Sequence, residues 1–363
     1  MKVPWFELFM NEKELNAVIE TIKSTWIGTG PRVKEFEEKL AEYVGVRHAI
    51  AVSSGTAALD IALKLLGIEP GHEVIVPGMA YIATVNSVLF QNATPVFADI
   101  DPNHYGMDPI SVEEWITKKT KCIIPINYGG HSVDWEKMRA ITDKKGIKII
   151  EDGAASFGGE YKGEKMCSLG DISITSFHVA KTFTSVEGGM IFTDDDEYAR
   201  KATMIRSHGE DPNKKYWHPM LGHNYRMTDV HASIGLAQFS RIDKLLDKRT
   251  EVANYYSDLL TGFSGVTPPT VQEGCKHSWF IYPVLVDNRD EVKKILQDNG
   301  VETNVSWPYP AYEQLHLNKF KKAVLPVTEN ITSSIIGLPM FYAIKKEQQK
   351  YVVEQLKKAV NNS

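Results

Sequence analysis

The chain has 363 residues, 43% hydrophobic and 24% charged, so its composition is that of a globular protein rather than a disordered or fibrous one. A formal net charge of -5, with no dense block of Lys and Arg, argues against nucleic acid as a partner. We expect no membrane span, no metal site and a cytoplasmic location, because no long apolar run occurs and the three cysteines are widely scattered.

Two amphipathic helices are predicted near the start of the chain, at residues 11–24 and 32–45, joined by a loop that contains two glycines and a proline. From His48 onward, short apolar strands alternate with helices. The predicted strands are 48–54, 72–77, 94–101, 122–127, 147–152, 171–177 and 188–195, and the helices between them are 55–67, 81–92 and 132–146. This pattern predicts an α/β fold with a seven-stranded, mostly parallel sheet covered by helices on both faces.

The last third of the chain has a different pattern. One long helix is predicted from about Asp229 to Leu260, followed by a strand at 279–287 and helices at 289–300 and 345–360. We therefore expect a large α/β domain over residues 1–240, including an N-terminal helical arm, and a smaller α+β domain over residues 241–363.

Small residues link the first strand of the sheet to the next helix. Ser53, Ser54, Gly55 and Thr56 leave the first N–H groups of that helix accessible, which favours an anion such as a phosphate. A simple N-cap by Ser53 or Ser54 is the alternative. Because neither a Walker loop nor a G-x-G-x-x-G pattern is present, a nucleoside triphosphate or a dinucleotide is disfavoured, and a smaller phosphorylated cofactor stays open.

Three more chemically capable residues follow predicted strands, namely Tyr81, Asp152 and Lys181, and Ser176 lies five residues before the lysine. Taken singly, each has an ordinary role: a packed aromatic, a capping or ion-paired acid, and a solvated lysine. The carboxyl ends of parallel strands meet at one edge of a sheet. We therefore expect these four residues to lie close to one another and to the segment from Ser53 to Thr56. A phosphate site, an aromatic ring, a carboxylate and an amine together match pyridoxal 5′-phosphate (PLP).

The motifs occur in an order that resembles the sugar aminotransferases of the DegT/DnrJ/StrS family, over essentially the whole chain. The segments that carry the resemblance are Gly55–Leu59, Pro77–Tyr81, Glu151–Ala154, Gly170–Lys181, Glu187–Gly189 and Gly222–Met227. The resemblance implies a PLP enzyme of fold type I, similar to aspartate aminotransferase, that forms a homodimer with active sites at the subunit interface.

The resemblance also implies roles for individual residues. Lys181 would form the Schiff base with PLP, Asp152 would meet the pyridine nitrogen and Tyr81 would stack on the ring. The phosphate would be bound by Gly55, Thr56 and Ser176, with Asn224 reaching it from the partner subunit.

The implied reaction moves an amino group from L-glutamate to a keto sugar, most simply a nucleotide-linked one, in the biosynthesis of amino sugars for surface polysaccharides. Lysine rather than histidine at position 181 favours transamination over sugar dehydration. His178 could contact substrate or guide protons, or be structural; Arg226 could bind an anionic substrate or bridge the dimer. The aromatic loop residues Trp307 and Tyr309 are further substrate candidates.

One position departs from the family pattern. Ala155 stands where Gln or His is usual, which removes a polar group near the cofactor or substrate and leaves the identity of the acceptor open. Two alternatives therefore stay open: a smaller phosphorylated ketone or aldehyde, or a cyclitol, as acceptor, and a PLP-binding protein without catalysis.

Overall fold

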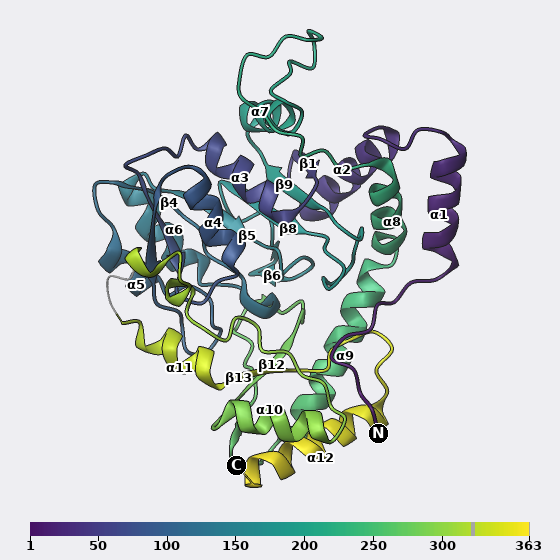
Figure 1. The fold of residues 1–363 in the computed structure, drawn as a ribbon, viewed down its shortest axis with the longest axis vertical. Coiled ribbons are helices and arrows are strands. Elements are labelled where there is room, and N and C mark those ends of the chain that lie inside the picture. Colours follow the sequence, from purple (N-terminus) through teal and green to yellow (C-terminus); the bar gives the residue numbers. More distant parts are fainter. Residues whose placement is uncertain (321–323, 363) are drawn as a thin grey trace.

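A computed structural model describes residues 1–320 and 324–362 of the chain, in which a central sheet forms the upper body and a smaller lobe lies below it (Figure 1). Seven strands run in the order β1-β9-β8-β5-β4-β2-β3. Their bounds are His48–Val52 (β1), Glu73–Pro77 (β2), Thr94–Ala98 (β3), Thr120–Ile123 (β4), Lys148–Asp152 (β5), Ile172–Ser176 (β8) and Gly189–Thr193 (β9). The predicted seven-stranded sheet is confirmed.

The directions of the strands determine which residues lie together at one edge of the sheet. Neighbours from β8 through β5, β4 and β2 to β3 pair in parallel, whereas β9 is antiparallel to both β1 and β8. The sheet is therefore mostly parallel, as expected. Because β9 starts where its neighbours end, Gly189 pairs with both Val52 and Ser176, and the end of β5 lies one strand further along.

Helices cover both faces of the sheet, because alternate strand residues face opposite cores. Ile150 belongs to the core formed with α3, α4 and α7, and Ile149 to the core formed with α5 and α6. Near β1 and β9, helices α2 and α8 cover the same face as α5 and α6. The helix bounds are Glu12–Lys23 (α1), Pro31–Val44 (α2), Gly55–Leu65 (α3), Ile82–Phe90 (α4), Pro109–Trp115 (α5), Trp135–Lys145 (α6), Asp196–Arg206 (α7) and Asp229–Phe239 (α8).

The lower lobe contains a three-stranded antiparallel sheet in the order β10-β12-β13, packed with α9, α10 and α12 around one apolar core. Val3 joins this core and bridges to Val301, so the N-terminal residues lie beside the lobe. The bounds of the elements in this part of the chain are Ile242–Leu260 (α9), Val266–Thr267 (β10), Tyr282–Val286 (β12), Arg289–Asp298 (α10), Pro326–Ser334 (α11), Ile335–Leu338 (β13) and Lys346–Asn362 (α12). A further small sheet consists of Glu160–Tyr161 (β6), Glu164–Lys165 (β7) and Cys275–Lys276 (β11).

The prediction of one continuous helix from about Asp229 to Leu260 is wrong. α8 ends at Phe239 and α9 begins at Ile242, because Arg241 adopts a non-helical conformation with φ -132° and ψ 25°. The Arg241 side chain forms an ion pair with Glu14 of α1, which also accepts a hydrogen bond of 2.9 Å from Gln238. This buried contact between distant segments accompanies the break, which no glycine or proline marks in the sequence.

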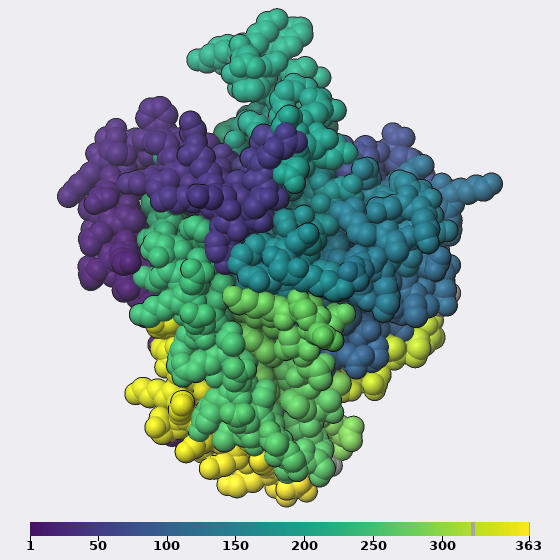
Figure 2. Space-filling model, turned by 180° about the vertical axis from the view of Figure 1, so that it is seen from behind, coloured from purple at the N-terminus to yellow at the C-terminus, as the bar shows by residue number. Residues whose placement is uncertain are grey.

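After α7, the chain forms a projection that stands clear of the body at the top of the molecule, in Figure 1 and again in the view from behind in Figure 2. Tyr216 and Trp217 on this segment are largely exposed. Within residues 1–320 and 324–362, none of the helices combines the length and the apolar character needed to cross a membrane.

Candidate active site

The predicted phosphate site forms where β1, β8 and β9 meet. Ser54 is the N-cap of α3, and its hydroxyl accepts a hydrogen bond of 3.1 Å from the N–H of Ala57. Gly55 faces Ser176 so closely that a Cβ on Gly55 would lie 3.0 Å from the Ser176 Cβ. A Cβ on Gly189 would lie 2.4 Å from the carbonyl oxygen of Ser54. Glycine is therefore required for this close approach.

These residues fit a phosphate. In the described part of the chain, the N–H groups of Gly55 and Thr56 donate to no other group, and the Ser176 hydroxyl accepts a bond of 3.3 Å from the N–H of His178. Free N–H groups at the start of an α-helix attract anions through their own charge and through the helix dipole. The N-cap and the anion site are thus compatible, since the cap uses the N–H of Ala57.

Asp152 ends β5 and is almost fully buried, with 4% of its surface exposed. Its carboxylate accepts 2.8 Å from the hydroxyl of Thr84 and 3.1 Å from the N–H of Ala154. Burial raises the pKa of Asp152, while these two donors and the charge of Lys181 act in the opposite direction. The carboxylate can meet a cationic pyridine nitrogen, because such a partner replaces the lost hydration.

Glu151, the residue before Asp152, fixes the end of β5 from the other side. Its buried carboxylate accepts hydrogen bonds of 2.8–2.9 Å from the N–H groups of Cys167 and Leu169, the hydroxyl of Ser173 and the amide of Asn127. Burial raises the pKa of Glu151, and the four donors lower it. Glu151 thus supports the backbone from which Asp152 projects.

Lys181 lies in the loop between β8 and β9, where its N–H donates to the carbonyl of His178 at 2.9 Å. Burial lowers the pKa of its amine to about 8, and Asp152 is close enough to act in the opposite direction. The amine lies 4.6 Å from the centroid of the Phe280 ring, a contact with the lower lobe that sequence reasoning missed. The structure therefore brings Lys181 and Asp152 together at the same edge of the sheet.

Tyr81, just before α4, exposes 57% of its surface and is available to cover a flat ring. The ring of Trp307 lies 6.4 Å from that of Tyr81 and 5.2 Å from that of Tyr128, between centroids. Trp307, a substrate candidate from the sequence, thus lies beside the predicted stacking residue although 226 positions separate them in the chain. Tyr309 is exposed and makes no ring contact among the described residues.

The other predicted residues lie around this centre. His178 is exposed, and its imidazole lies 3.9 Å from Glu187. Arg226 pairs through its backbone with Val52 at the end of β1, next to the phosphate site. Asn224 is exposed and pairs through its backbone with Ser207. Its side chain has no hydrogen-bond partner among the described residues of this chain.

Thr84 is a supporting residue that the sequence reasoning missed. It lies one helical turn after Tyr81, and this i, i+3 spacing was a signal that both face the site. At the unusual Ala155, the side chain is buried and the carbonyl accepts from the Ser278 hydroxyl at 3.4 Å. The following Ser156 accepts from Asn127 at 3.1 Å, within the Glu151 network, and so does not replace the missing polar group.

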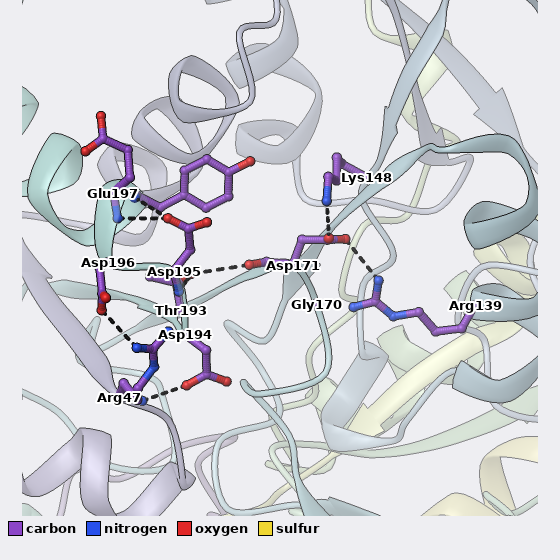
Figure 3. A pocket seen from close by; sticks show the side chains of 11 residues that line it. Arg47, Arg139, Lys148, Gly170, Asp171, Thr193, Asp194, Asp195, Asp196 and Glu197 are labelled. Carbon is purple, nitrogen blue, oxygen red and sulfur yellow. Dashed lines mark hydrogen bonds and ion pairs between the residues drawn. The ribbon is translucent and has the colours of Figure 1, made fainter.

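A hollow of about 650 Å³ opens at the opposite edge of the sheet (Figure 3). Five of its charged side chains pair with one another: Arg47 with Asp196 at 3.1 Å, and both Arg139 and Lys148 with Asp171 at 3.0 and 2.8 Å. Because strand ends place ligands at the carboxyl edge, this hollow is not the candidate active site.

Comparison with known proteins agrees with the geometry. A family profile, that of the DegT/DnrJ/EryC1/StrS aminotransferase family, matches residues 9–357. GDP-perosamine synthase of Caulobacter vibrioides is 40% identical over 315 residues, 85% of this chain and 84% of that protein. UDP-2-acetamido-2-deoxy-3-oxo-D-glucuronate aminotransferase of Pseudomonas aeruginosa is 38% identical over 312 residues, 86% of each. The structure of Spr1654 from Streptococcus pneumoniae in its PLP form is 29% identical with a TM-score of 0.95, covering 100% of this chain and 99% of that one.

The fold and site are those of a PLP-dependent aminotransferase, and PLP is the cofactor. The chain belongs to the DegT/DnrJ/EryC1/StrS aminotransferase family. The resemblance found in the sequence motifs is thereby confirmed.

Proposed function

We propose that this enzyme transfers an amino group from L-glutamate to a nucleotide-linked keto sugar in amino-sugar biosynthesis. The observation that carries the proposal is the nearness of Lys181 to Asp152, close enough for each charge to act on the pKa of the other, beside the predicted phosphate site at Gly55 and Ser176. The substrate class is supported by relatives whose names specify GDP- and UDP-linked sugars. Trp307, whose ring lies 6.4 Å from that of Tyr81, suits a large acceptor.

The residues divide the work by their chemistry. PLP, when bound, supplies an electron sink for the bond broken at the amino carbon of the substrate. Asp152 would hold positive charge at the pyridine nitrogen, and Tyr81 would cover the ring. Gly55, Thr56 and Ser176 would hold the phosphate through their N–H and hydroxyl groups.

Lys181 would move the proton in each half of the reaction. A base works best when its pKa is near the working pH, and burial brings the pKa of Lys181 down to about 8. Roughly a tenth of the amine is then uncharged at about pH 7 and able to accept the proton. His178 and Arg226 are proposed substrate contacts.

We propose that the enzyme works as a cytoplasmic homodimer in which Asn224 completes the phosphate site of the partner. The exposed position of Asn224, on the segment that lines the end of β1, supports this role. We place the boundary between the large and small domains at residues 240–241, where α8 gives way to α9.

The donor is tested with the purified holoenzyme and L-glutamate alone. We expect the PLP absorbance to give way to that of pyridoxamine phosphate, with one 2-oxoglutarate released per subunit. An unchanged spectrum would contradict the proposal and favour the reading of a PLP-binding protein without catalysis.

The acceptor is tested by isothermal titration with GDP, UDP, CDP and dTDP, followed by mass spectrometry of keto-sugar reactions. We expect one of the four nucleotides to bind. If none binds while the glutamate half-reaction proceeds, the acceptor is a smaller ketone, aldehyde or cyclitol, an alternative that Ala155 leaves open.

A further inference from the structure

The amine of Lys181 rests on an aromatic ring that comes from the other part of the molecule. Its Nζ lies 4.6 Å from the centroid of the Phe280 ring. Phe280 lies two residues before β12 of the lower lobe, whereas Lys181 belongs to the loop between two strands of the central sheet. A cation within about 6 Å of a ring centroid is attracted by the negative face of the ring.

The backbone that carries Phe280 is held by a buried arginine. Arg249 of α9 is 6% exposed, and its guanidinium donates to the carbonyls of Trp279 and Phe280 at 2.9 and 3.1 Å. Among the described residues Arg249 forms no ion pair, and burial lowers the pKa of this arginine to about 10. Burying a cation without a counterion is unfavourable, and the hydrogen bonds to these two carbonyls offset part of that cost.

We propose that Phe280, fixed by Arg249, is a positioning residue that holds the side-chain amine of Lys181 in place for reaction. This rests on the proposed function only in taking Lys181 as the reacting amine. The lysine side chain has four rotatable bonds, and a ring beneath its end restricts the orientations open to the amine once it is released. The contact also links the lower lobe to the reacting centre.

Other charged groups lie near Lys181, and their effect on its pKa has to be kept constant in the test. Asp152 faces the Lys181 amine from β5, and its negative charge acts against the lowering of the Lys181 pKa by burial. Glu7 of the N-terminal segment and Arg249 of α9 line a small cavity together with Lys181. The variants below leave Asp152 and Glu7 unchanged.

The test measures Lys181 in the apoprotein, by acetic anhydride labelling across pH and peptide mass spectrometry. Phe280→Leu removes the ring that stabilises the ammonium, so we expect the pKa of Lys181 to fall by about 0.5 to 1 unit. Phe280→Tyr keeps the ring and should restore the original value. Both bonds come from Nη1 of Arg249, and Arg249→Lys keeps a positive charge on a side chain that is one bond shorter, which draws the donor away from the two carbonyls. This variant should shift the pKa of Lys181 in the same direction as Phe280→Leu.

A matched control comes from the same lobe. Phe263 carries Lys357 at 5.1 Å from its ring centroid, so Phe263→Leu removes an equivalent contact away from the site and should leave Lys181 unchanged. In the holoenzyme, Phe280→Leu should lower kcat with little change in the KM for glutamate. A Lys181 pKa that is the same in wild type and Phe280→Leu would overturn the proposal. The apoprotein result does not depend on the glutamate half-reaction, so the two proposals fail separately.

Discussion

Asp152 is buried and Lys181 is partly buried, and loss of hydration acts on their pKa values in opposite directions. It raises the pKa of the carboxyl and lowers that of the amine, while the attraction between them opposes both shifts. Thr84 adds a hydrogen bond of 2.8 Å to the carboxylate. The sequence predicted Asp152 and Lys181 as site residues because each follows a predicted strand. The Thr84 hydroxyl lies on a separate helix, and the only sequence signal for it was its spacing of three residues from Tyr81.

Replacing Thr84 by Val removes a donor from a buried carboxylate and keeps the shape of the side chain. We expect kcat/KM and PLP affinity to fall roughly ten- to a hundredfold, since losing a hydrogen bond to a buried charged group costs about 1–3 kcal/mol. Steady-state kinetics and PLP titration would measure both. Thr142→Val, which removes a buried hydroxyl that bonds to Met138 on α6, should leave both values unchanged. Equal effects of the two variants would exclude a specific role for Thr84.

The lowered pKa of Lys181 predicts a pH-dependent stability in the apoprotein. The unfolded lysine titrates near 10.5 and the folded one at about 8, so burial of the ammonium costs free energy below pH 8 and the cost disappears as the pH rises to about 10.5. Lys181→Met should therefore raise the free energy of unfolding by up to about 3 kcal/mol at about pH 7, with the gain declining above about pH 8. Urea unfolding at several pH values measures this difference. A gain independent of pH would contradict the assignment.

At the scale of elements, helix α3 combines a cap with an anion site at one end. Ser54→Ala removes the hydroxyl that caps the N–H of Ala57, and we expect a loss of about 1 kcal/mol in stability together with weaker PLP binding. Asp195 caps α7 through the N–H groups of Glu197 and Tyr198, far from the site, so Asp195→Ala should lower stability without changing PLP affinity. Thermal unfolding and PLP titration of both variants separate the two effects. A Ser54→Ala enzyme with unaltered PLP affinity would show that the cap does not order the site.

Most elements of the sheet could be predicted, because their signals are local. The strand β5 was expected at 147–152 and lies at Lys148–Asp152, and helix α3 was expected at 55–67 and lies at Gly55–Leu65. The break between α8 and α9 could not be predicted, since it coincides with the ion pair between Arg241 and Glu14, residues far apart in sequence. Helical propensity alone favours continuity there.

At the scale of the whole molecule, the site draws on segments that only the fold brings together. Trp307 reaches Tyr81, and Phe280 reaches Lys181, from the last third of the chain. The motifs give the order of the predicted cofactor residues along the chain, but no local pattern specifies where a distant loop folds back. Trp307 was therefore a candidate from composition, and Phe280 was missed.

The proposed shared site predicts that two inactive variants can complement each other. Lys181→Ala lacks the reacting amine, and Asn224→Ala lacks the side chain proposed to reach the partner. After mixing and reassortment, heterodimers contain one intact site, so activity should return to roughly a quarter of wild type. Activity of the mixture that stays at the level of the separate variants would contradict a site shared between subunits.

Lys181 is the residue that we propose to hold PLP. Borohydride reduction of the holoenzyme, followed by peptide mapping with mass spectrometry, tests it directly. We expect a pyridoxyl group on Lys181, and none on this peptide in Lys181→Ala. A label on Lys162 or Lys165 instead would contradict it.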